Sequence, residues 1–173
     1  MSVQASIVIN RPVEEVFHLL TGGDDNPFLD WPTILSPEGL YLHGPTYMDA
    51  SSEITITKIS DGPARVGATY RRMVRVRGED EQETIEVTEY VPNSRYSYKI
   101  SADTFKGHFV YAYLIESSEA GTKVTLKVDN KLQGPLRWLR TALALIPYQR
   151  KAIAELLVDG PLYRLKLEVE SSE

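Results

Sequence analysis

The sequence predicts an α+β domain in which a curved antiparallel β-sheet is wrapped around a long C-terminal α-helix. Three observations support this fold class. A strand and a short helix come first, six strand-like segments then follow without helices between them, and residues from 135 onward carry a helical pattern. Consecutive strands pair as antiparallel neighbours, whereas parallel strands need crossover helices. A sheet of this size must be covered on one face, and the C-terminal helix is the only predicted element long enough.

The first strand and helix occupy the N-terminal region. Odd positions within 3–9 are apolar and even positions mostly polar, which is the pattern of a strand with one buried face. A helix is expected from Asn10, because Pro12 and two acids suit a first turn. Its apolar stripe consists of Val13, Val16, Phe17 and Leu20. The glycines at 22–23 should end it, and a short helical turn is expected at 26–31.

The central segments predict a run of strands separated by Gly, Pro and Asn turns. These strands are expected at 53–59, 68–77, 82–91, 95–101, 105–116 and 122–132. From Pro135, leucines and isoleucines spaced three and four apart predict the terminal helix. Pro147 and the Gly160–Pro161 pair should kink or break that helix.

Composition favours one globular domain over residues 1–173, since 42% of the residues are hydrophobic and 25% are charged. The net charge of −5 argues against nucleic acid as a partner, because binding to phosphates needs a basic face. With no cysteine, the chain has neither disulfides nor thiolate sites and suits the cytoplasm. The N-terminus lacks the pattern of a secretory signal, and the longest apolar run is too short for stable membrane insertion.

Several local motifs, taken in order, carry a resemblance to a known superfamily. They are 5–17 (ASIVINRPVEEVF), Trp31, 66–70 (VGATY), 87–92 (VTEYVP), 121–125 (GTKVT) and 164–168 (RLKLE). The chain resembles the START, birch-pollen-allergen and polyketide cyclase–dehydratase superfamily (SRPBCC), which has the helix-grip fold. Two departures are Ala68, in place of the second small polar residue of a Gly-Thr pair, and the Gly160–Pro161 interruption. Members of that superfamily include carriers, hormone receptors, cyclases and chaperone activators, so the resemblance implies a fold rather than a reaction.

Strand alternation predicts which side chains line a cavity between sheet and helix. The expected ligand-binding residues are Trp31, Tyr70, Arg72, Val74, Val87, Glu89, Tyr98, Phe109, Tyr111 and Tyr113. Tyrosines at alternate positions suggest an aromatic pocket with polar tips, although tyrosine is also common in ordinary sheet cores. A buried Arg72 would meet an acid such as Glu89 or offer its guanidinium to a ligand; the alternative is that it lies near a strand end and reaches solvent.

Three functions are compatible with such a cavity. The leading hypothesis is a carrier that binds a small hydrophobic or aromatic metabolite, without a cofactor. The second is an enzyme of the cyclase or dehydratase type, for which His43, His108 and Glu89 are acid–base candidates. The third is a protein-interaction domain of the chaperone-activator type. The histidines lack metal-ligand spacing, no catalytic residue is assigned, and a homodimer is compatible with the sequence.

Overall fold

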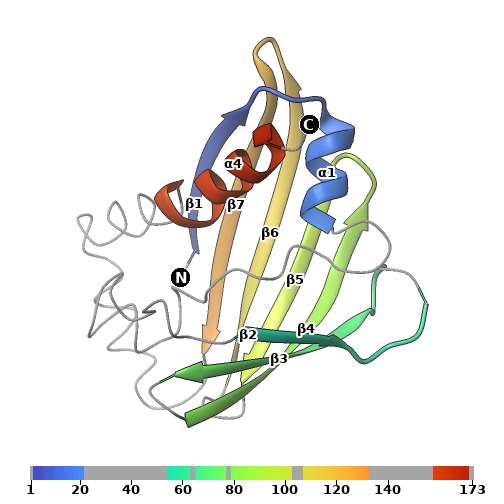
Figure 1. Ribbon diagram of the computed structural model, residues 1–173, viewed down its shortest axis with the longest axis vertical. Coiled ribbons are helices and arrows are strands. Elements are labelled where there is room, and N and C mark those ends of the chain that lie inside the picture. Colours follow the sequence, from blue (N-terminus) through green and yellow to red (C-terminus); the bar gives the residue numbers. More distant parts are fainter. Residues whose placement is uncertain are drawn as a thin grey trace.

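The described residues form a seven-stranded antiparallel sheet with helices packed on one of its faces (Figure 1). This computed structural model describes residues 2–21, 54–62, 65–76, 79–102, 107–132 and 158–171. The strands are β1 (Ser2–Ile9), β2 (Ile54–Lys58), β3 (Thr69–Val76), β4 (Glu79–Val91), β5 (Arg95–Ala102), β6 (Gly107–Ser118) and β7 (Gly121–Leu132). The helical elements are α1 (Val13–Thr21), the π-helical turn η3 (Val158–Leu162) and α4 (Tyr163–Ser171).

The strand order is β1-β7-β6-β5-β4-β3-β2, so each strand from β2 to β7 pairs with its neighbour in the chain. The N-terminal strand β1 then pairs with β7, from Ser2 opposite Asp129 to Ile9 opposite Thr122. All seven predicted strands are present, and the α+β helix-grip class is confirmed. The expected helical turn at 26–31 and the helix from Pro135 to residue 157 lie outside the described residues.

Gly121 allows the first strand to approach the start of β7. Its φ of +117° lies in the region that favours glycine. A Cβ atom at this position would collide with the carbonyl oxygen of Ile9 and lie 2.9 Å from Cα of Asn10. The absence of a side chain therefore lets the β1–α1 turn cross directly over the β6–β7 hairpin.

The helices bury apolar stripes against the sheet. On α1 the buried positions include Val16, Phe17 and Leu20, as the helical spacing predicts. Near the C-terminus, Leu162, Leu165 and Val169 are buried in the same core. α1 contacts β6, β7 and α4, and α4 contacts β1. None of the helices in the described ranges is long and apolar enough to cross a membrane.

The Gly160–Pro161 pair lies inside the π-helical turn η3, and α4 follows it directly. Proline lacks the amide hydrogen of a regular helical bond, and a wider turn accommodates that loss. The predicted interruption is therefore a local widening before the last helix.

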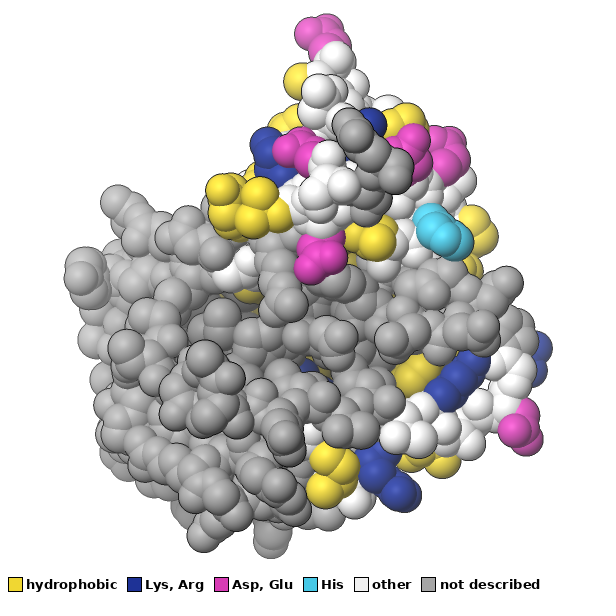
Figure 2. All heavy atoms as spheres, viewed as in Figure 1, with side chains coloured by type: hydrophobic (Ala, Val, Ile, Leu, Met, Phe, Trp, Pro, Cys, Tyr) yellow, Lys and Arg dark blue, Asp and Glu magenta, His cyan; other side chains and the backbone are white. Residues whose placement is uncertain are grey.

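On the face shown in Figure 2, acidic and basic side chains of the described residues are mixed rather than separated by sign.

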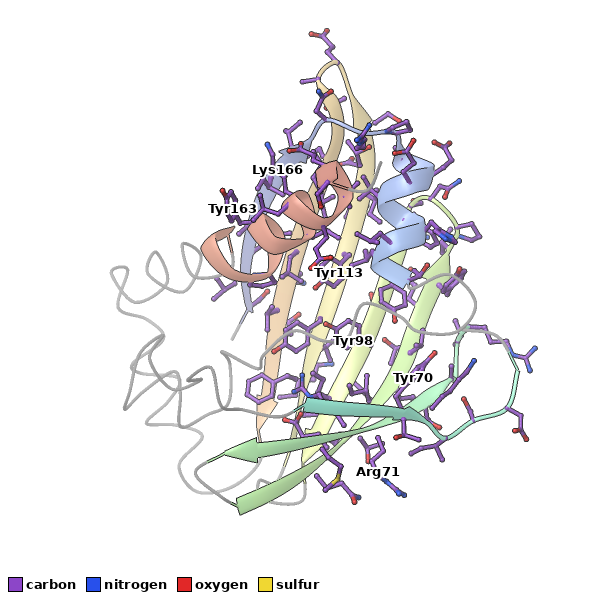
Figure 3. The ribbon with its side chains drawn as sticks, viewed as in Figure 1. Tyr70, Arg71, Tyr98, Tyr113, Tyr163 and Lys166 are labelled. Carbon is purple, nitrogen blue, oxygen red and sulfur yellow. The ribbon has the colours of Figure 1, made fainter. Side chains whose placement is uncertain are left out.

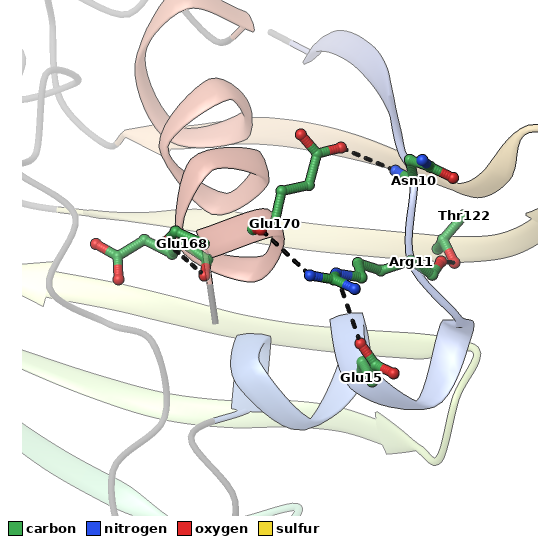
Figure 4. A network of polar contacts seen from close by, with 7 residues as sticks. Asn10, Arg11, Glu15, Thr122, Glu168 and Glu170 are labelled. Carbon is green, nitrogen blue, oxygen red and sulfur yellow. Dashed lines mark hydrogen bonds and ion pairs between the residues drawn. The ribbon is translucent and has the colours of Figure 1, made fainter. Parts of the chain in front are cut away.

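A polar network ties α4 to the turn between β1 and α1 (Figure 4). The backbone amide of Asn10 donates to Glu170 Oε1 at 2.9 Å, and Arg11 Nη2 donates to the Glu170 carbonyl oxygen at 3.2 Å. Lys166 Nζ donates to the Val8 carbonyl oxygen at 3.1 Å and lies 3.7 Å from Glu170 Oε1. We call Asn10, Arg11, Lys166 and Glu170 the C-terminal latch.

Candidate ligand-binding face

One side of the sheet carries a continuous set of buried side chains, which we call the inner face. It includes Tyr70 and Arg72 of β3; Glu83, Ile85 and Val87 of β4; Tyr96, Tyr98 and Ile100 of β5; Phe109, Tyr111, Tyr113 and Ile115 of β6; and Val124, Leu126 and Val128 of β7. Helix α1 covers part of this face, because Phe17 contacts Tyr90 edge-on at a centroid distance of 5.3 Å. Tyr90 in turn contacts Tyr96 at 6.2 Å.

Four tyrosine rings on β5 and β6 contact one another on the inner face, and Figure 3 labels two of them, Tyr98 and Tyr113. Tyr98 and Tyr111 are opposite each other and stack at 5.2 Å, with 13° between their planes. Tyr96 lies opposite Tyr113 at 6.5 Å. The hydroxyls of Tyr98 and Tyr113 share a hydrogen bond, which lowers the pKa of Tyr98 and raises the pKa of Tyr113. We call Tyr96, Tyr98, Tyr111 and Tyr113 the tyrosine cluster.

Burial keeps these phenols protonated at neutral pH. It raises the pKa of Tyr96, Tyr111 and Tyr113 well above the usual value, and it raises the pKa of Tyr98 to about 12. The pKa of Tyr70 is also raised, chiefly by burial. Desolvation disfavours the phenolate, so each hydroxyl is a neutral hydrogen-bonding group.

Two hydroxyls of the inner face differ from the rest. Tyr70 on β3 is 1% exposed and Tyr96 on β5 is 0% exposed. Within the described part of the chain, the hydroxyl oxygens of these two residues have no hydrogen-bond partner. Buried polar atoms are nearly always paired in native proteins, so each unpaired one requires an explanation.

A buried ion pair lies at the β3–β4 side of the inner face. Arg72 and Glu83 are direct neighbours in the antiparallel register and are 1% and 5% exposed. The Nε and Nη2 atoms of Arg72 both contact Glu83 Oε2. The prediction that Arg72 points inward is confirmed, and the alternative in which it reaches solvent is wrong. Its charge is balanced by Glu83 rather than by Glu89.

The family model described as "Polyketide cyclase / dehydrase and lipid transport" matches residues 1–159. The chain belongs to this family. No sequence match was found among the curated proteins.

Solved structures similar to this member of the polyketide cyclase/dehydrase and lipid transport family share its fold at low identity. Protein SA2116 of unknown function from Staphylococcus aureus is 13% identical, with a TM-score of 0.61 over 98% of this chain and 92% of that chain. Ara h 8.0201 is 15% identical, with a TM-score of 0.54 over 92% and 99%. DynU16, from the dynemicin biosynthetic locus, is 15% identical, with a TM-score of 0.54 over 99% of this chain and 48% of that chain.

The expected inward position of Glu89 is wrong. The register between β4 and β5 shifts between Val87 and Glu89, so that Glu89 aligns with Ser97. A bulge adds a residue to one strand and exchanges the faces of those that follow. The Glu89 side chain is 39% exposed and lies 3.3 Å from Arg95 Nε. Tyr90 takes the inward position, opposite Tyr96.

The structure also locates the remaining predicted site residues of this family member. Val87 and Phe109 are buried on the inner face. Trp31 lies outside the described residues, as does His43, and Val74 is described only as a backbone position of β3. His108 precedes Phe109 on β6 and is half-buried on the opposite side of that strand. An acid–base role on the inner face therefore finds no support at His108.

Sequence reasoning missed Glu83 and Tyr90. Glu83 has the same strand parity as Ile85, and a hairpin near residues 77–78 would have placed it opposite Arg72. That register was available as a signal for a buried partner of Arg72. Tyr90 faces inward because of the bulge after Val87. Residues 82–91 contain no glycine or proline that would have indicated a bulge in the sequence.

Proposed function

We propose that this protein binds a small hydrophobic or aromatic molecule on the inner face of its sheet and acts as a carrier. The observation that carries the proposal is the tyrosine cluster, in which four buried rings on two adjacent strands contact one another. Aromatic rings offer large surfaces for dispersion and apolar burial, and their hydroxyls supply a few polar contacts. The description of the family, which includes lipid transport, supports the same function.

The charges on the inner face favour holding a molecule over transferring protons to it. The Glu83 carboxylate is engaged by Arg72, and burial holds the nearby tyrosines in their protonated form by raising the pKa of Tyr98 and Tyr111. A general acid or base works best when its pKa lies near the working pH. The buried phenols have pKa values too high for that role, so we place carrier function ahead of cyclase or dehydratase activity.

Native mass spectrometry of freshly purified protein tests the proposal. We expect an additional discrete mass that is lost on denaturation and recovered in an organic extract, or one-to-one binding of a hydrophobic aromatic probe to the empty protein. Binding of a probe that is released unchanged supports a carrier. A clean protein mass together with no binding from a panel of lipophilic probes would overturn the proposal. Conversion of a bound poly-carbonyl compound into a new product would replace it by the enzyme function.

A further inference from the structure

We infer that Tyr70 and Tyr96 supply the polar contacts of the ligand site, and that the ligand is a neutral molecule with a carbonyl or hydroxyl oxygen that accepts from one or both of them. This inference rests on the proposed function, which it makes more specific. It follows from two features of the inner face: two buried hydroxyls without a partner, and a buried cation that is already balanced.

The unpartnered hydroxyls stand out against a satisfied pair nearby. Tyr98 and Tyr113 share a hydrogen bond, whereas in the described part of the chain the hydroxyls of Tyr70 and Tyr96 have no partner although both side chains are almost fully buried. Leaving a buried hydroxyl unpaired is unfavourable, and the same group becomes favourable when a bound molecule supplies an oxygen. The inner face thus carries two polar groups whose hydrogen bonds a bound molecule can supply.

Both residues lie on the inner face, where the register places Tyr70 level with Ile100 and Tyr96 opposite Tyr90. Tyr70 belongs to β3 and Tyr96 to β5, with β4 between them. Tyr90 of β4 contacts the Tyr96 ring, and electrostatic interaction with Tyr90 raises the pKa of both Tyr70 and Tyr96. Tyr70 itself also raises the pKa of Tyr96. Tyr70 is directed away from its strand neighbour Arg71, which is exposed (Figure 3). Each of the two hydroxyls can therefore donate to an oxygen of a ligand bound on this face.

The ion pair argues for a neutral ligand. Arg72 is the buried guanidinium of the described inner face, and Glu83 neutralises it through two contacts to one oxygen. A ligand carboxylate would have to displace Glu83 or remain without a matching charge in a desolvated site, and both are costly. The protonated tyrosine hydroxyls can donate a hydrogen bond to a ketone oxygen. With an alcohol they can both donate and accept a hydrogen bond.

Three probes of similar shape test the inference by calorimetric titration of the full chain. They are 2-acetylnaphthalene, its hydrocarbon isostere 2-isopropenylnaphthalene, and the anion 2-naphthoate. We expect the ketone to bind most tightly and the anion most weakly. At least one of the variants Tyr70→Phe and Tyr96→Phe should weaken binding of the ketone by about fivefold, and both should leave binding of the hydrocarbon unchanged. Tyr163→Phe, the same change at an exposed position of α4, should alter neither affinity.

The outcomes separate the inference from the proposed function. Equal binding of ketone and hydrocarbon by the wild-type protein would overturn the inference and leave the carrier function intact. Tightest binding of naphthoate would overturn the neutral-ligand claim. Failure of all probes to bind would count against the proposed function, and the inference would fall with it.

Thermal unfolding without ligand gives an independent readout. Tyr70→Phe and Tyr96→Phe should keep or raise the melting temperature, because each removes an unpaired buried hydroxyl. A clear loss of melting temperature would show that the hydroxyls are already satisfied within the empty protein, by chain atoms or a bridging water, and would overturn the inference.

Discussion

Arg72 and Glu83 face each other across β3 and β4 and form an ion pair that is almost completely removed from solvent. Burying two charges is costly, and only close geometry and further hydrogen bonds compensate for the lost hydration. Removing one partner takes the nearest opposite charge away from a buried charge. The free energy of unfolding should therefore fall strongly when one residue of the pair is replaced and much less when both are replaced.

We expect Arg72→Met and Glu83→Gln each to lower the free energy of unfolding by about 3–5 kcal/mol. The double variant Arg72→Met/Glu83→Met should lose much less than the sum of these effects, because it buries no charge. Urea unfolding of the four proteins gives the coupling energy directly.

The exposed pair Lys99–Glu86 provides the matched control. Its atoms lie 2.7 Å apart across β4 and β5, with side chains 35% and 38% exposed. Because solvent screens this pair, Lys99→Met and Glu86→Gln should each change stability by less than about 1 kcal/mol. Additive effects of the Arg72 and Glu83 substitutions would contradict the assignment of a coupled buried pair.

Strand alternation was sufficient to predict the seven strands and most of the inner face. Tyr70, Arg72, Tyr98 and Tyr111 all lie where period-two spacing places them, because side chains alternate strictly along a regular strand. The prediction failed at Glu89, where a bulge after Val87 exchanges the two faces. Bulges depend on pairing with the neighbouring strand, so a pattern read along a single strand does not reveal them.

The ion pair could be found only by adding the β3–β4 register to the strand pattern, and the unpartnered hydroxyls were beyond reach of the sequence. The partner of Arg72 depends on the β3–β4 register, which places Glu83 rather than Glu89 beside it. The hydroxyls of Tyr70 and Tyr96 are distinguished from that of Tyr98 only by their surroundings in three dimensions. Composition and spacing assign all three to one face and cannot separate them.

Replacing Gly121 with Ala should be strongly destabilising. Its φ of +117° disfavours a side chain, and the added Cβ would collide with the backbone of Ile9. We expect a loss of at least about 2 kcal/mol in the free energy of unfolding. Gly67→Ala is the control, because Gly67 has a φ of +87° and nothing within 4 Å of the added atom. Equal losses at the two positions would show that backbone conformation alone, and not the close approach of β1, sets the cost.

Stability should fall as the pH rises above about 10. Burial raises the pKa of Tyr98 to about 12 in the folded protein, and it also raises the pKa of Tyr70, Tyr96, Tyr111 and Tyr113. Below the unfolded-state pKa of about 10, both states keep these phenols protonated and the shifts have no effect on stability. Above it, the unfolded chain loses protons that the folded protein retains, so stability declines until the folded pKa is passed.

Denaturant unfolding between pH 8 and pH 11.5, with tyrosinate absorbance recorded in parallel, measures this dependence. Tyr98→Phe should reduce the slope of unfolding free energy against pH by about 1.4 kcal/mol per unit in the range from 10 to 12. Tyr163→Phe, at an exposed position, serves as the comparison for the same chemical change. Ionisation of the buried tyrosines before any loss of folded structure would contradict the prediction.

The C-terminal latch should stabilise the packing of α4 against β1. Its main contribution should be the hydrogen bond from the Asn10 backbone amide to Glu170, rather than the attraction between charged side chains. Glu170 Oε1 accepts from the Asn10 amide at 2.9 Å, whereas its distance to Lys166 Nζ is 3.7 Å at a half-exposed position. Glu170→Gln keeps an oxygen that can accept the amide hydrogen and should cost less than about 0.5 kcal/mol. Glu170→Ala leaves the amide without this acceptor and should cost about 1 kcal/mol, with faster hydrogen exchange at Asn10. Equal losses for the two variants would show that charge, and not the bond to Asn10, holds the helix end.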